Sequence, residues 1–336
     1  MIDPARPEAK PAVAKFKGAG ITTVMITGDH KDTAFAIAKD LGIASDISQC
    51  MMGSDVDNMN EEELQKACKT VRVFARVSPE NKVQIVKAFE ANGNICAMTG
   101  DGVNDAPSLK AANIGIAMGI TGTDVAKGAA DMVLTDDNFA SIEKAVEEGR
   151  GIYANIRKTV IFLLSSNIAE VLVMFVVICL GLPSPLIAIH LLWVNLVTDS
   201  LPAIALGMDP KDPNIMRDKP RDSKEGIFAH GGMRNTLMYG AFLTFGVLIT
   251  YFFPAWMEGV FSIDGINELY SNAEGITGIG HQAQTMAFTT LALSELFHMV
   301  GMSDLKRSFV HVFKDKNWMM LIAFIIGIVL QLFVIE

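Results

Sequence analysis

Residues 99–107 read Thr-Gly-Asp-Gly-Val-Asn-Asp-Ala-Pro and directly follow a short apolar run at 95–98. The stretch places two carboxylates, Asp101 and Asp105, and the carboxamide of Asn104 on a glycine-rich loop. Oxygen ligands of this kind suit magnesium, which prefers octahedral oxygen coordination and keeps waters that a phosphate can replace. A turn that merely caps a helix at Asp105 would leave Asp101 and Asn104 unexplained. The stretch therefore predicts a magnesium and phosphate site.

The sequence on either side of this loop alternates between short apolar runs and helical stretches. The runs predict strands at 21–26, 71–75, 95–98, 114–117 and 132–134. Between them, helices are predicted at 31–41, 79–91, 105–112 and 123–129. This order is typical of a parallel α/β sheet, in which functional residues collect at the carboxyl ends of the strands.

Two more loops carry polar side chains at such positions. Thr27, Gly28 and Asp29 follow one predicted strand, and Lys82 lies in the first turn of the helix predicted at 79–91. Alone, the first group reads as a helix cap and the second as a surface lysine. The order of a threonine, then a lysine, then two aspartates along one chain favours a shared site instead.

Composition separates the two halves of the 336-residue chain. Half of the residues are hydrophobic and the mean hydropathy is +0.33, while 18 of the 28 Lys and Arg residues lie before residue 159. The first half is therefore typical of a soluble domain and the second of a membrane domain. A net charge of −9 without a basic stripe excludes nucleic acid as an expected partner. Four scattered cysteines form no C-x-x-C pair, which argues against a thiolate metal site.

Five long apolar runs follow residue 158, each close to the roughly 20 residues that a helix needs to cross a bilayer. Polar residues interrupt the second and fourth, so a buried soluble helix is the alternative there. Lysine and arginine cluster before the first run, after the second and after the fourth, and are absent between the third and fourth. This alternation predicts a multi-pass membrane protein with a cytoplasmic amino-terminal domain. The predicted spans are 159–182, 186–206, 236–253, 284–302 and 318–335.

Ionisable and amide side chains lie inside these runs, where an unpaired charge is costly and therefore suggests function. No lysine or arginine accompanies them at that depth, which disfavours a purely structural hydrogen-bonded network. An all-oxygen set suits a hard cation rather than zinc or copper. His298 is interpreted as a hydrogen-bonded neighbour and not as a ligand. The candidate ligands are Asn167, Glu170, Asn195, Thr198, Asp199 and Glu295.

The motifs T-G-D-G-V-N-D-A-P at 99–107, M-I-T-G-D at 25–29 and D-P-x-R at 3–6 resemble those of P-type cation-transporting ATPases. The resemblance continues into the membrane half and covers nearly the whole chain. It implies a haloacid dehalogenase-like α/β domain at 1–150 followed by an all-α transmembrane bundle at 151–336. It also implies ATP and magnesium as cofactors. The implied catalytic residues are Thr27, Gly28, Asp29, Lys82, Asn104 and Asp105, with magnesium at Asp101 and Asp105 and the nucleotide near Asp3 and Arg6.

The aspartate that this family phosphorylates lies in a D-K-T-G-T motif, and no such string occurs in residues 1–336. Asp55 and Asp57 are interpreted as part of an acidic loop and not as a substitute. The chain resembles a carboxy-terminal portion with the fifth to ninth membrane helices, and we expect it to be inactive alone. The implied partners are the lipid bilayer and the amino-terminal part with the actuator domain, the nucleotide-binding domain and the first four helices.

The membrane motifs S-S-N-x-x-E at 165–170 and N-L-V-T-D at 195–199 resemble those of sarcoplasmic-reticulum-type calcium pumps. The position of Glu295 matches as well. The resemblance therefore implies ATP-driven calcium transport through a phosphoenzyme cycle. A sodium or manganese pump is an alternative, and so is a truncated membrane protein that binds ions without turnover.

Overall fold

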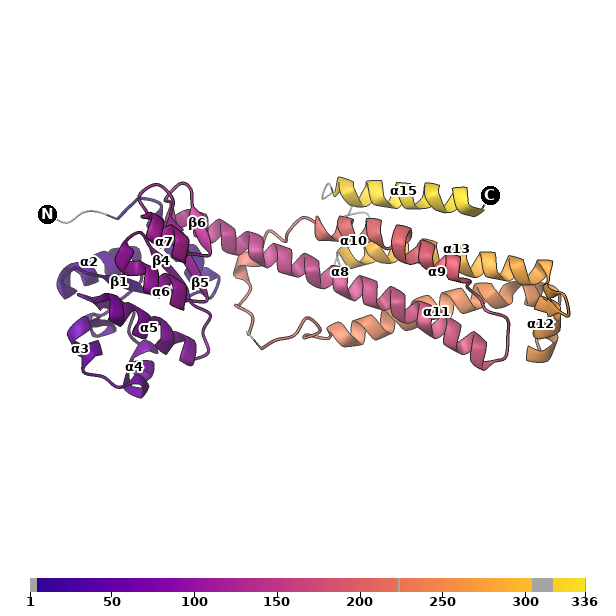
Figure 1. Cartoon of the computed structure of the whole chain (residues 1–336), viewed down its shortest axis with the longest axis horizontal. Coiled ribbons are helices and arrows are strands. Elements are labelled where there is room, and N and C mark those ends of the chain that lie inside the picture. The colour runs from indigo at the N-terminus through magenta and orange to yellow at the C-terminus, as the bar shows by residue number, and fades with distance from the viewer. Residues whose placement is uncertain (1–4, 223, 304–316, 336) are drawn as a thin grey trace. The chain divides into compact units, whose positions relative to one another are not determined.

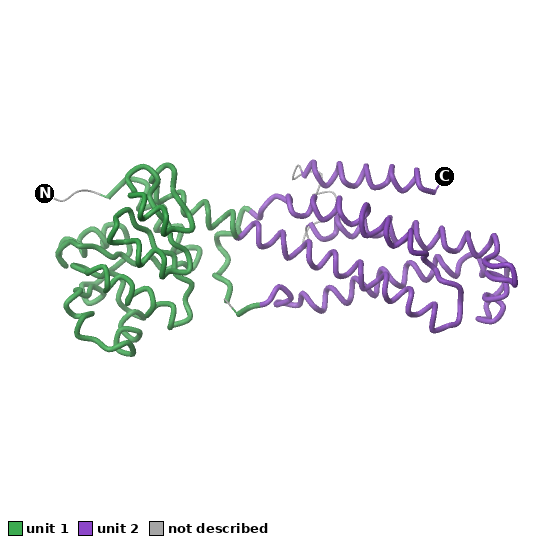
Figure 2. Tube along the Cα trace, in the orientation of Figure 1, with its two compact units in different colours: residues 1–149, 213–225 green, residues 150–212, 226–336 purple. Residues whose placement is uncertain are grey.

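The computed structural model describes residues 5–222, 224–303 and 317–335 (Figure 1). The chain divides into two units, which Figure 2 colours separately. Unit 1 comprises Met1–Gly149 and Pro213–Glu225, and unit 2 comprises Arg150–Asp212 and Gly226–Glu336. The chain passes from unit 1 to unit 2 within helix α8 (Phe139–Cys179).

Two three-stranded parallel sheets form the centre of unit 1 in the described part of the chain. Ile26 of the first sheet packs against the apolar cluster that contains Met98 of the second, so the two sheets share a core. The predicted parallel α/β architecture is thereby confirmed. In the first sheet the strands lie in the order β1 (Met25–Thr27), β3 (Val73–Ala75) and β2 (Cys50–Met52). In the second sheet the order is β4 (Ala97–Gly100), β5 (Ile114–Met118) and β6 (Met132–Leu134).

Helices connect these strands, and local sequence sets their ends. In α5 (Pro79–Ala91), the Ser78 hydroxyl accepts the Asn81 amide while the Asn81 side chain accepts the Ser78 amide, which forms a capping box. Gly42 ends α2 in a left-handed conformation with φ 78°. The remaining helices of unit 1 are α1 (Ala9–Gly18), α2 (Lys31–Leu41), η1 (Ile47–Gln49), α3 (Gly53–Asp57), α4 (Glu61–Cys68), η2 (Val103–Asp105), α6 (Ala106–Ala111), α7 (Asp124–Ala129) and η4 (Ile215–Arg217).

The prediction of an acidic loop at Asp55 and Asp57 is wrong, because both residues lie in α3. Asp55 accepts a hydrogen bond from the Met52 amide at 3.0 Å and so caps this helix. Asp57 accepts one from the buried side chain of Asn81 at 2.6 Å. Both carboxylates therefore have structural partners, in keeping with the interpretation that neither is a substitute nucleophile.

Unit 2 is a bundle of long helices. Four of them are long and apolar enough to cross a membrane in the described residues: α8, the continuous stretch Ala188–Gly207, α11 (Gly232–Met257) and α15 (Trp318–Ile335). The stretch Ala188–Gly207 consists of α9 (Ala188–Trp193), the π-helix η3 (Val194–Thr198) and α10 (Ser200–Gly207). Helix α13 (Gly278–Ser303) is of similar length but is more polar and is not among the four.

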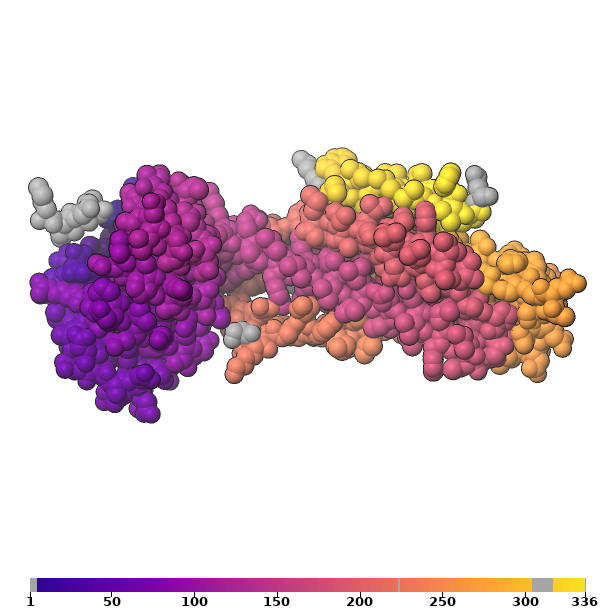
Figure 3. All heavy atoms as spheres, viewed as in Figure 1, coloured from indigo at the N-terminus to yellow at the C-terminus, as the bar shows by residue number. Residues whose placement is uncertain are grey.

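Helices α10, α13 and α15 pack together around Leu206, Met299 and Met320, all nearly inaccessible to solvent. Figure 3 shows α15 in yellow seated directly on this part of the bundle. Gly327 lies so close to Leu296 of α13 that a side chain there would collide with it. The three helices are therefore fixed against one another by close contacts between side chains.

Between α11 and α13, residues 262–280 have secondary structure of their own. This segment contains α12 (Ile263–Tyr270) and the antiparallel pair β7 (Ser271–Asn272) and β8 (Gly275–Ile276). Tyr270 is fully buried, and its hydroxyl donates to the Tyr251 carbonyl and accepts from the Ala255 amide. Pro254 interrupts α11 at this point, and the tyrosine hydroxyl takes a place in the hydrogen-bond ladder.

Candidate functional site

The loop after β4 is organised around the carboxylate of Asp105. One oxygen, Oδ2, accepts hydrogen bonds from the backbone amides of Asp101 and Gly102 at 3.2 and 3.0 Å. The other, Oδ1, accepts from the Lys82 ammonium at 2.5 Å. Asp105 is buried, whereas Asp101 and Asn104 are exposed. The buried carboxylate thus fixes the loop that presents the exposed Asp101 and Asn104.

Burial alone would raise the pKa of Asp105, but the hydrogen bonds from Lys82 and from the Gly102 amide outweigh it. The net effect lowers the pKa of Asp105 below its ordinary value of 3.8. Asp105 is therefore ionised at neutral pH and keeps its attraction to the Lys82 ammonium. A lysine in the first turn of α5 and an aspartate of the next strand loop are brought together, as their order in the sequence suggested.

Gly100 allows this arrangement. A Cβ atom at residue 100 would collide with the Cβ of Asp105 and lie 2.8 Å from its Cγ. Any side chain at position 100 would push the carboxylate out of place. The glycine is therefore required by close approach, and not by an unusual backbone angle.

The loop after β1 presents Thr27, Gly28 and Asp29. The Thr27 hydroxyl donates to Asp29 Oδ2 at 2.9 Å and accepts the Asp29 amide at 3.1 Å. Its neighbour across the sheet is the loop after β3, where the Arg76 amide donates to the Asp29 carbonyl at 3.1 Å. Arg76 adopts a left-handed conformation with φ 50°, uncommon for a residue other than glycine. The two loops are thereby joined through their backbones.

Asp101 is the residue best placed to bind magnesium. It is exposed, and magnesium commonly takes one or two protein carboxylates while keeping several waters. Both oxygens of Asp105, by contrast, already have hydrogen-bond partners. In the described residues, no three His, Cys, Asp or Glu side chains gather into a set that could hold a metal alone. The residues fit a magnesium ion whose coordination is completed by water and phosphate oxygens.

The D-P-x-R motif is only partly described, because Asp3 lies outside the described residues. Arg6 donates to the backbone carbonyl of Asp137 at 2.6 Å. The Asp137 carboxylate accepts from the amides of Ile120 and Thr121 and from the Thr121 hydroxyl. The hydrogen bond from Ile120, with those from Thr121, lowers the pKa of Asp137 to about 2, although burial opposes the shift. Arg6 thus stabilises the region that follows β6.

In unit 2, three carboxylates are buried on three different helices. Glu295 of α13 is fully buried, Asp199 at the start of α10 is 3% exposed, and Glu170 of α8 is 7% exposed. Asp199 and Glu170 are close enough to Glu295 to act on it electrostatically. Neither oxygen of Glu295, nor Oδ1 of Asp199, has a hydrogen-bond partner in the described part of the chain. Buried polar atoms without partners are rare, and they point to a missing cation or proton.

Two amides predicted as ligands have other partners. Asn195 donates to both oxygens of Glu170, at 3.2 and 3.0 Å, and Asn167 donates to the Leu163 carbonyl at 2.8 Å. Their side-chain oxygens, the atoms that would bind a cation, are not used in these bonds. Thr198 and Asp199 are buried while Asn195 is exposed, and the π-helix η3 covers this stretch of the chain.

His298 forms a hydrogen bond to a residue of a neighbouring helix, as its position in the sequence suggested. Its Nε2 atom lies 2.8 Å from the Ser165 hydroxyl, and its ring packs against Tyr239 with centroids 4.8 Å apart. It lies one turn beyond Glu295 on α13 but is hydrogen-bonded to α8. The buried carboxylates Glu170, Asp199 and Glu295 do not by themselves gather into a metal-binding set in the described residues, with or without this histidine.

Comparison with known proteins agrees with both halves of this description. Residues 1–113 match the family model for haloacid dehalogenase-like hydrolase, and residues 183–336 match that for the cation transporting ATPase C-terminus. The chain is 51% identical over its whole length to "Calcium-transporting ATPase 1" of Bacillus cereus, of which it covers 37%. The chain belongs to the P-type cation-transporting ATPases. The predicted haloacid dehalogenase-like domain followed by a helical membrane region is confirmed.

Two further relatives support the same family. The chain is 48% identical over 89% of its length to "Calcium-transporting ATPase" of Bacillus subtilis, and it covers 32% of that protein. It is 38% identical over its whole length to human "Calcium-transporting ATPase type 2C member 1" and covers 34% of it. The chain therefore spans about a third of the length of these P-type ATPases. Like them, it is a multi-pass membrane protein.

Sequence reasoning missed several residues of this ATPase chain that the structure brings into view. Arg76 lies at the same sheet edge as Thr27, but its left-handed conformation gives no sequence signal. Asp137 was not among the candidate site residues, and its contacts with the loop at 119–123 depend on tertiary packing. Asp209 was not singled out at all, since it follows an apolar run with no motif to mark it.

Proposed function

We propose that this chain is the carboxy-terminal part of an ATP-driven calcium pump with a phosphoenzyme cycle. The observation that carries the proposal is Glu295, a fully buried carboxylate with no hydrogen-bond partner in the described residues, near Asp199 and Glu170 in a bundle of apolar helices. A carboxylate in that environment is costly unless it binds a cation or a proton. The names of the relatives favour calcium over sodium or manganese.

The ion site would be formed from oxygens of three helices. Glu170, Asp199 and Glu295 would supply the negative charge, and Asn167, Asn195 and Thr198 would supply neutral oxygens. Calcium takes six to eight oxygen ligands in flexible geometry, so a mixed set from several helices suits it. The Asn195 amide now donates to Glu170, and this side chain would turn its oxygen toward a bound ion.

In unit 1, phosphoryl transfer would depend on positioning and on neutralising charge. Asp101 would hold magnesium, which neutralises charge on the phosphate oxygens. Lys82 and the Thr27 hydroxyl would bind phosphoryl oxygens, while Gly28 allows close approach of the backbone. Asp105 would act mainly by fixing the loop and Lys82. Asp29, Asn104, Asp3 and Arg6 complete the proposed set, with Asp3 and Arg6 on the nucleotide side.

The phosphorylated aspartate would come from the part of the pump outside this chain. The strand orders of the two sheets of unit 1 support this assignment. Strands β1 and β4 are both edge strands, yet Ile26 and Met98 share one apolar cluster. A further parallel strand paired with both would join the two sheets and end between Thr27 and Asp101. Accordingly, the 336-residue chain alone should form no acid-stable phosphoenzyme from labelled ATP.

The proposal includes the orientation of the chain in the membrane and the number of its membrane spans. The domain at 1–150 would be cytoplasmic, and residues 151–336 would cross the bilayer five times, with α13 as the fourth span. Glu295 is one of several polar residues, with Gln284 and His298, that make α13 less apolar than its neighbours. Part of the charge pattern behind this orientation, Lys306, Arg307, Lys314 and Lys316, lies outside the described residues.

The test uses the full-length protein in sealed vesicles. Asp199→Asn keeps the shape of the side chain and removes its charge, so calcium-dependent ATPase activity should vanish, whereas Glu170→Gln and Glu295→Gln should weaken calcium binding by smaller amounts. Asp264→Asn, an exposed aspartate of α12, is the matched control and should behave as wild type. Ordinary calcium affinity in Asp199→Asn, or phosphorylation driven by sodium, would contradict the proposal.

A second variant separates the two sites. Asp101→Asn should abolish magnesium-dependent phosphorylation from ATP and leave calcium binding largely intact, because the two sites lie in different units. Removing one charge from the magnesium ligands weakens both the ion and the phosphate that it holds. Normal phosphoenzyme levels in Asp101→Asn would count against the assignment of Asp101.

A further inference from the structure

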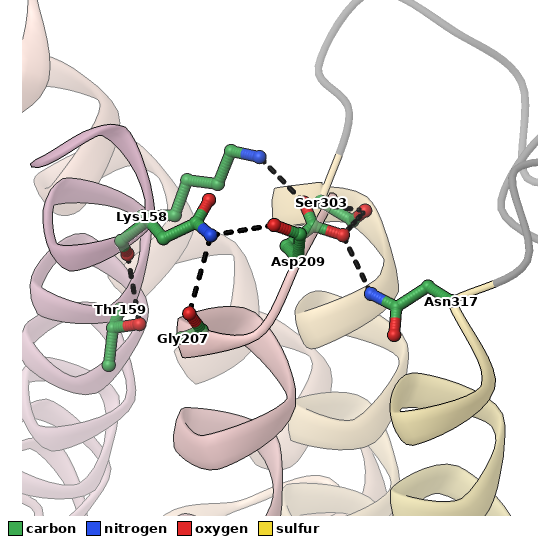
Figure 4. A network of polar contacts seen from close by, with 7 residues as sticks. Lys158, Thr159, Gly207, Asp209, Ser303 and Asn317 are labelled. Atoms are coloured by element: carbon green, nitrogen blue, oxygen red, sulfur yellow. Dashed lines mark hydrogen bonds and ion pairs between the residues drawn. The ribbon is translucent and has the colours of Figure 1, made fainter. Parts of the chain in front are cut away.

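A second buried carboxylate of unit 2, Asp209, is fully hydrogen-bonded where Glu295 is not (Figure 4). It lies two residues after the end of α10 and precedes Pro210, which keeps it out of helical conformation and ends the helix. Its side chain contacts three other segments of the chain. The donors are Lys158 Nζ at 2.6 Å, Asn317 Nδ2 at 2.7 Å and the Ser303 hydroxyl at 3.0 and 3.1 Å.

The backbone of Asp209 is held as well. The Asn155 side chain of α8 donates to the Asp209 carbonyl at 2.7 Å and to the Gly207 carbonyl at 3.3 Å. The side-chain oxygen of Asn317 accepts the Met320 amide and so caps the start of α15. Asp209 therefore links the middle of α8 to the ends of α10 and α13 and to the start of α15, as the dashed lines in Figure 4 show. We call this group the Asp209 clasp: Asn155, Lys158, Asp209, Ser303 and Asn317.

The clasp lies on the three helices that carry the buried carboxylates. At a rise of 1.5 Å per residue, Asp209 is roughly 15 Å along its helix from Asp199. Lys158 is roughly 18 Å from Glu170, and Ser303 roughly 12 Å from Glu295, by the same rise. On each helix, the clasp residue lies on the same side of the carboxylate, toward one end of the bundle. A shift of one helix along its axis at the clasp therefore moves its carboxylate relative to the other two.

The charges of the clasp suit a role in register better than a role in stability. The Asp209 side chain is only 5% exposed and that of Lys158 27%, so their attraction is offset by the cost of removing both charges from water. A pair of this kind adds little net stability but disfavours arrangements in which one charge is buried alone. The neutral donors Ser303 and Asn317 add directional bonds to the same carboxylate, which further restricts the arrangement.

We propose that Asp209 is a positioning residue that sets the relative register of α8, α10 and α13, and thereby the affinity of the carboxylate site for its cation. The inference rests on the proposed calcium transport, since that function supplies the cation. Asp209 itself does not touch the ion. Its effect passes through the helices, which it joins by an ion pair and hydrogen bonds.

The experiment compares variants of the full-length protein in vesicles. Asp209→Asn keeps the size of the side chain and removes its charge, and Lys158→Met removes the other charge. Each should raise the calcium concentration for half-maximal activation roughly 2- to 30-fold, the range found for residues that couple to a site without contacting it. The double variant should be no worse than the worse single variant, because both remove the same pair. Glu258→Gln, an exposed glutamate after α11, is the control and should leave calcium affinity unchanged.

Two further measurements distinguish a change in helix register from general damage to the protein. Phosphorylation by inorganic phosphate in the absence of calcium should keep its wild-type level, because it depends on unit 1. Hydrogen exchange should become faster in the last turn of α10, where the Met208 and Asp209 amides bond to Ile204 and Leu206. If Asp209→Asn does not fold, Ser303→Ala removes one neutral bond and should still shift calcium affinity in the same direction.

The inference and the proposed function can fail separately. Calcium uptake by the wild-type protein tests the function, and its absence would contradict calcium transport whatever the variants do. If the wild type takes up calcium but folded Asp209→Asn has unchanged calcium affinity, the proposal that Asp209 sets this affinity is wrong. Faster exchange in α10 with unchanged calcium affinity also overturns it, because the clasp would then hold the helix ends without affecting the ion site.

Discussion

Gly100→Ala tests the organisation of the site in unit 1. The added Cβ would collide with the Cβ of Asp105, its Cγ would lie at 2.8 Å and its Oδ2 at 3.0 Å. Contacts of this kind cannot be relieved by rotating a flexible tip, because the Cβ of Asp105 is fixed by its own backbone. Either the loop or the whole Asp105 side chain must move. Movement of Asp105 weakens its hydrogen bonds with Lys82 and with the Asp101 and Gly102 amides.

The size of the destabilisation follows from two costs, the overpacking at residue 100 and the weakened hydrogen bonds of Asp105. Overpacking costs about 1–3 kcal/mol, and weakening a hydrogen bond to a charged group costs about 1.5–3 kcal/mol. Because the two overlap, we expect local destabilisation of about 2–4 kcal/mol. At about 1.4 kcal/mol per factor of ten, amides held by Asp105 should exchange about 30- to 700-fold faster.

The assay is hydrogen exchange of the full chain, followed by mass spectrometry on peptides that cover residues 99–107. Gly128→Ala is the matched control, because a Cβ there meets nothing within 4 Å and alanine favours the helix α7. Wild-type protection of the Asp101 and Gly102 amides in Gly100→Ala would refute the argument, since the collision would then have been absorbed without moving Asp105.

Two further changes test tertiary contacts in each unit. With its pKa lowered to about 2 from the ordinary 3.8, ionised Asp137 stabilises unit 1 above about pH 4, and this contribution is lost as the pH falls toward about 2. Asp137→Asn should therefore destabilise unit 1 at neutral pH, because an amide nitrogen cannot accept from Thr121, and the difference from wild type in unfolding free energy should shrink at acid pH. A constant difference would contradict this. Tyr270→Phe should destabilise unit 2 by about 1–3 kcal/mol, since it leaves the Tyr251 carbonyl and the Ala255 amide without the hydroxyl. Thermal unfolding in detergent measures it, and an unchanged transition would exclude the bridging role.

The sequence predicted most of unit 1 because its signals are local. The helices at 31–41 and 79–91 match α2 and α5, since their caps and glycines lie within a few residues of the ends. Strand β2 was missed, because Cys50, Met51 and Met52 lack the β-branched and aromatic residues that mark strands. Its place in the sheet comes from pairing with β3, a contact between residues distant in sequence.

The membrane half was predicted in outline but not in detail. Apolar length located the helices, and α15 matches its predicted span at both ends. The π-helix was not predictable from periodicity, because the run of apolar residues around Asn195 and Asp199 fits an α-helix as well as a π-helix. The bond from the Asp199 amide to the Val194 carbonyl, five residues back, exposes Asn195 and buries Asp199. Which of these side chains face inward therefore depends on one hydrogen bond.

Asp209 and Glu295 show where sequence reasoning ends. Both are acidic residues in or beside apolar helices, and the sequence favoured Glu295 because it lies inside a predicted span and its position resembles that in calcium pumps. In the structure, Asp209 has a cation and neutral donors on both oxygens, whereas neither oxygen of Glu295 has a partner in the described residues. Burial is costly for both carboxylates, and among the described residues only Asp209 has hydrogen-bond partners that offset this cost. A protein that can satisfy one buried carboxylate and leaves the other unsatisfied on a neighbouring helix keeps the second available for a ligand. The contrast therefore favours the proposed positioning role for Asp209 and the proposed ion-binding role for Glu295.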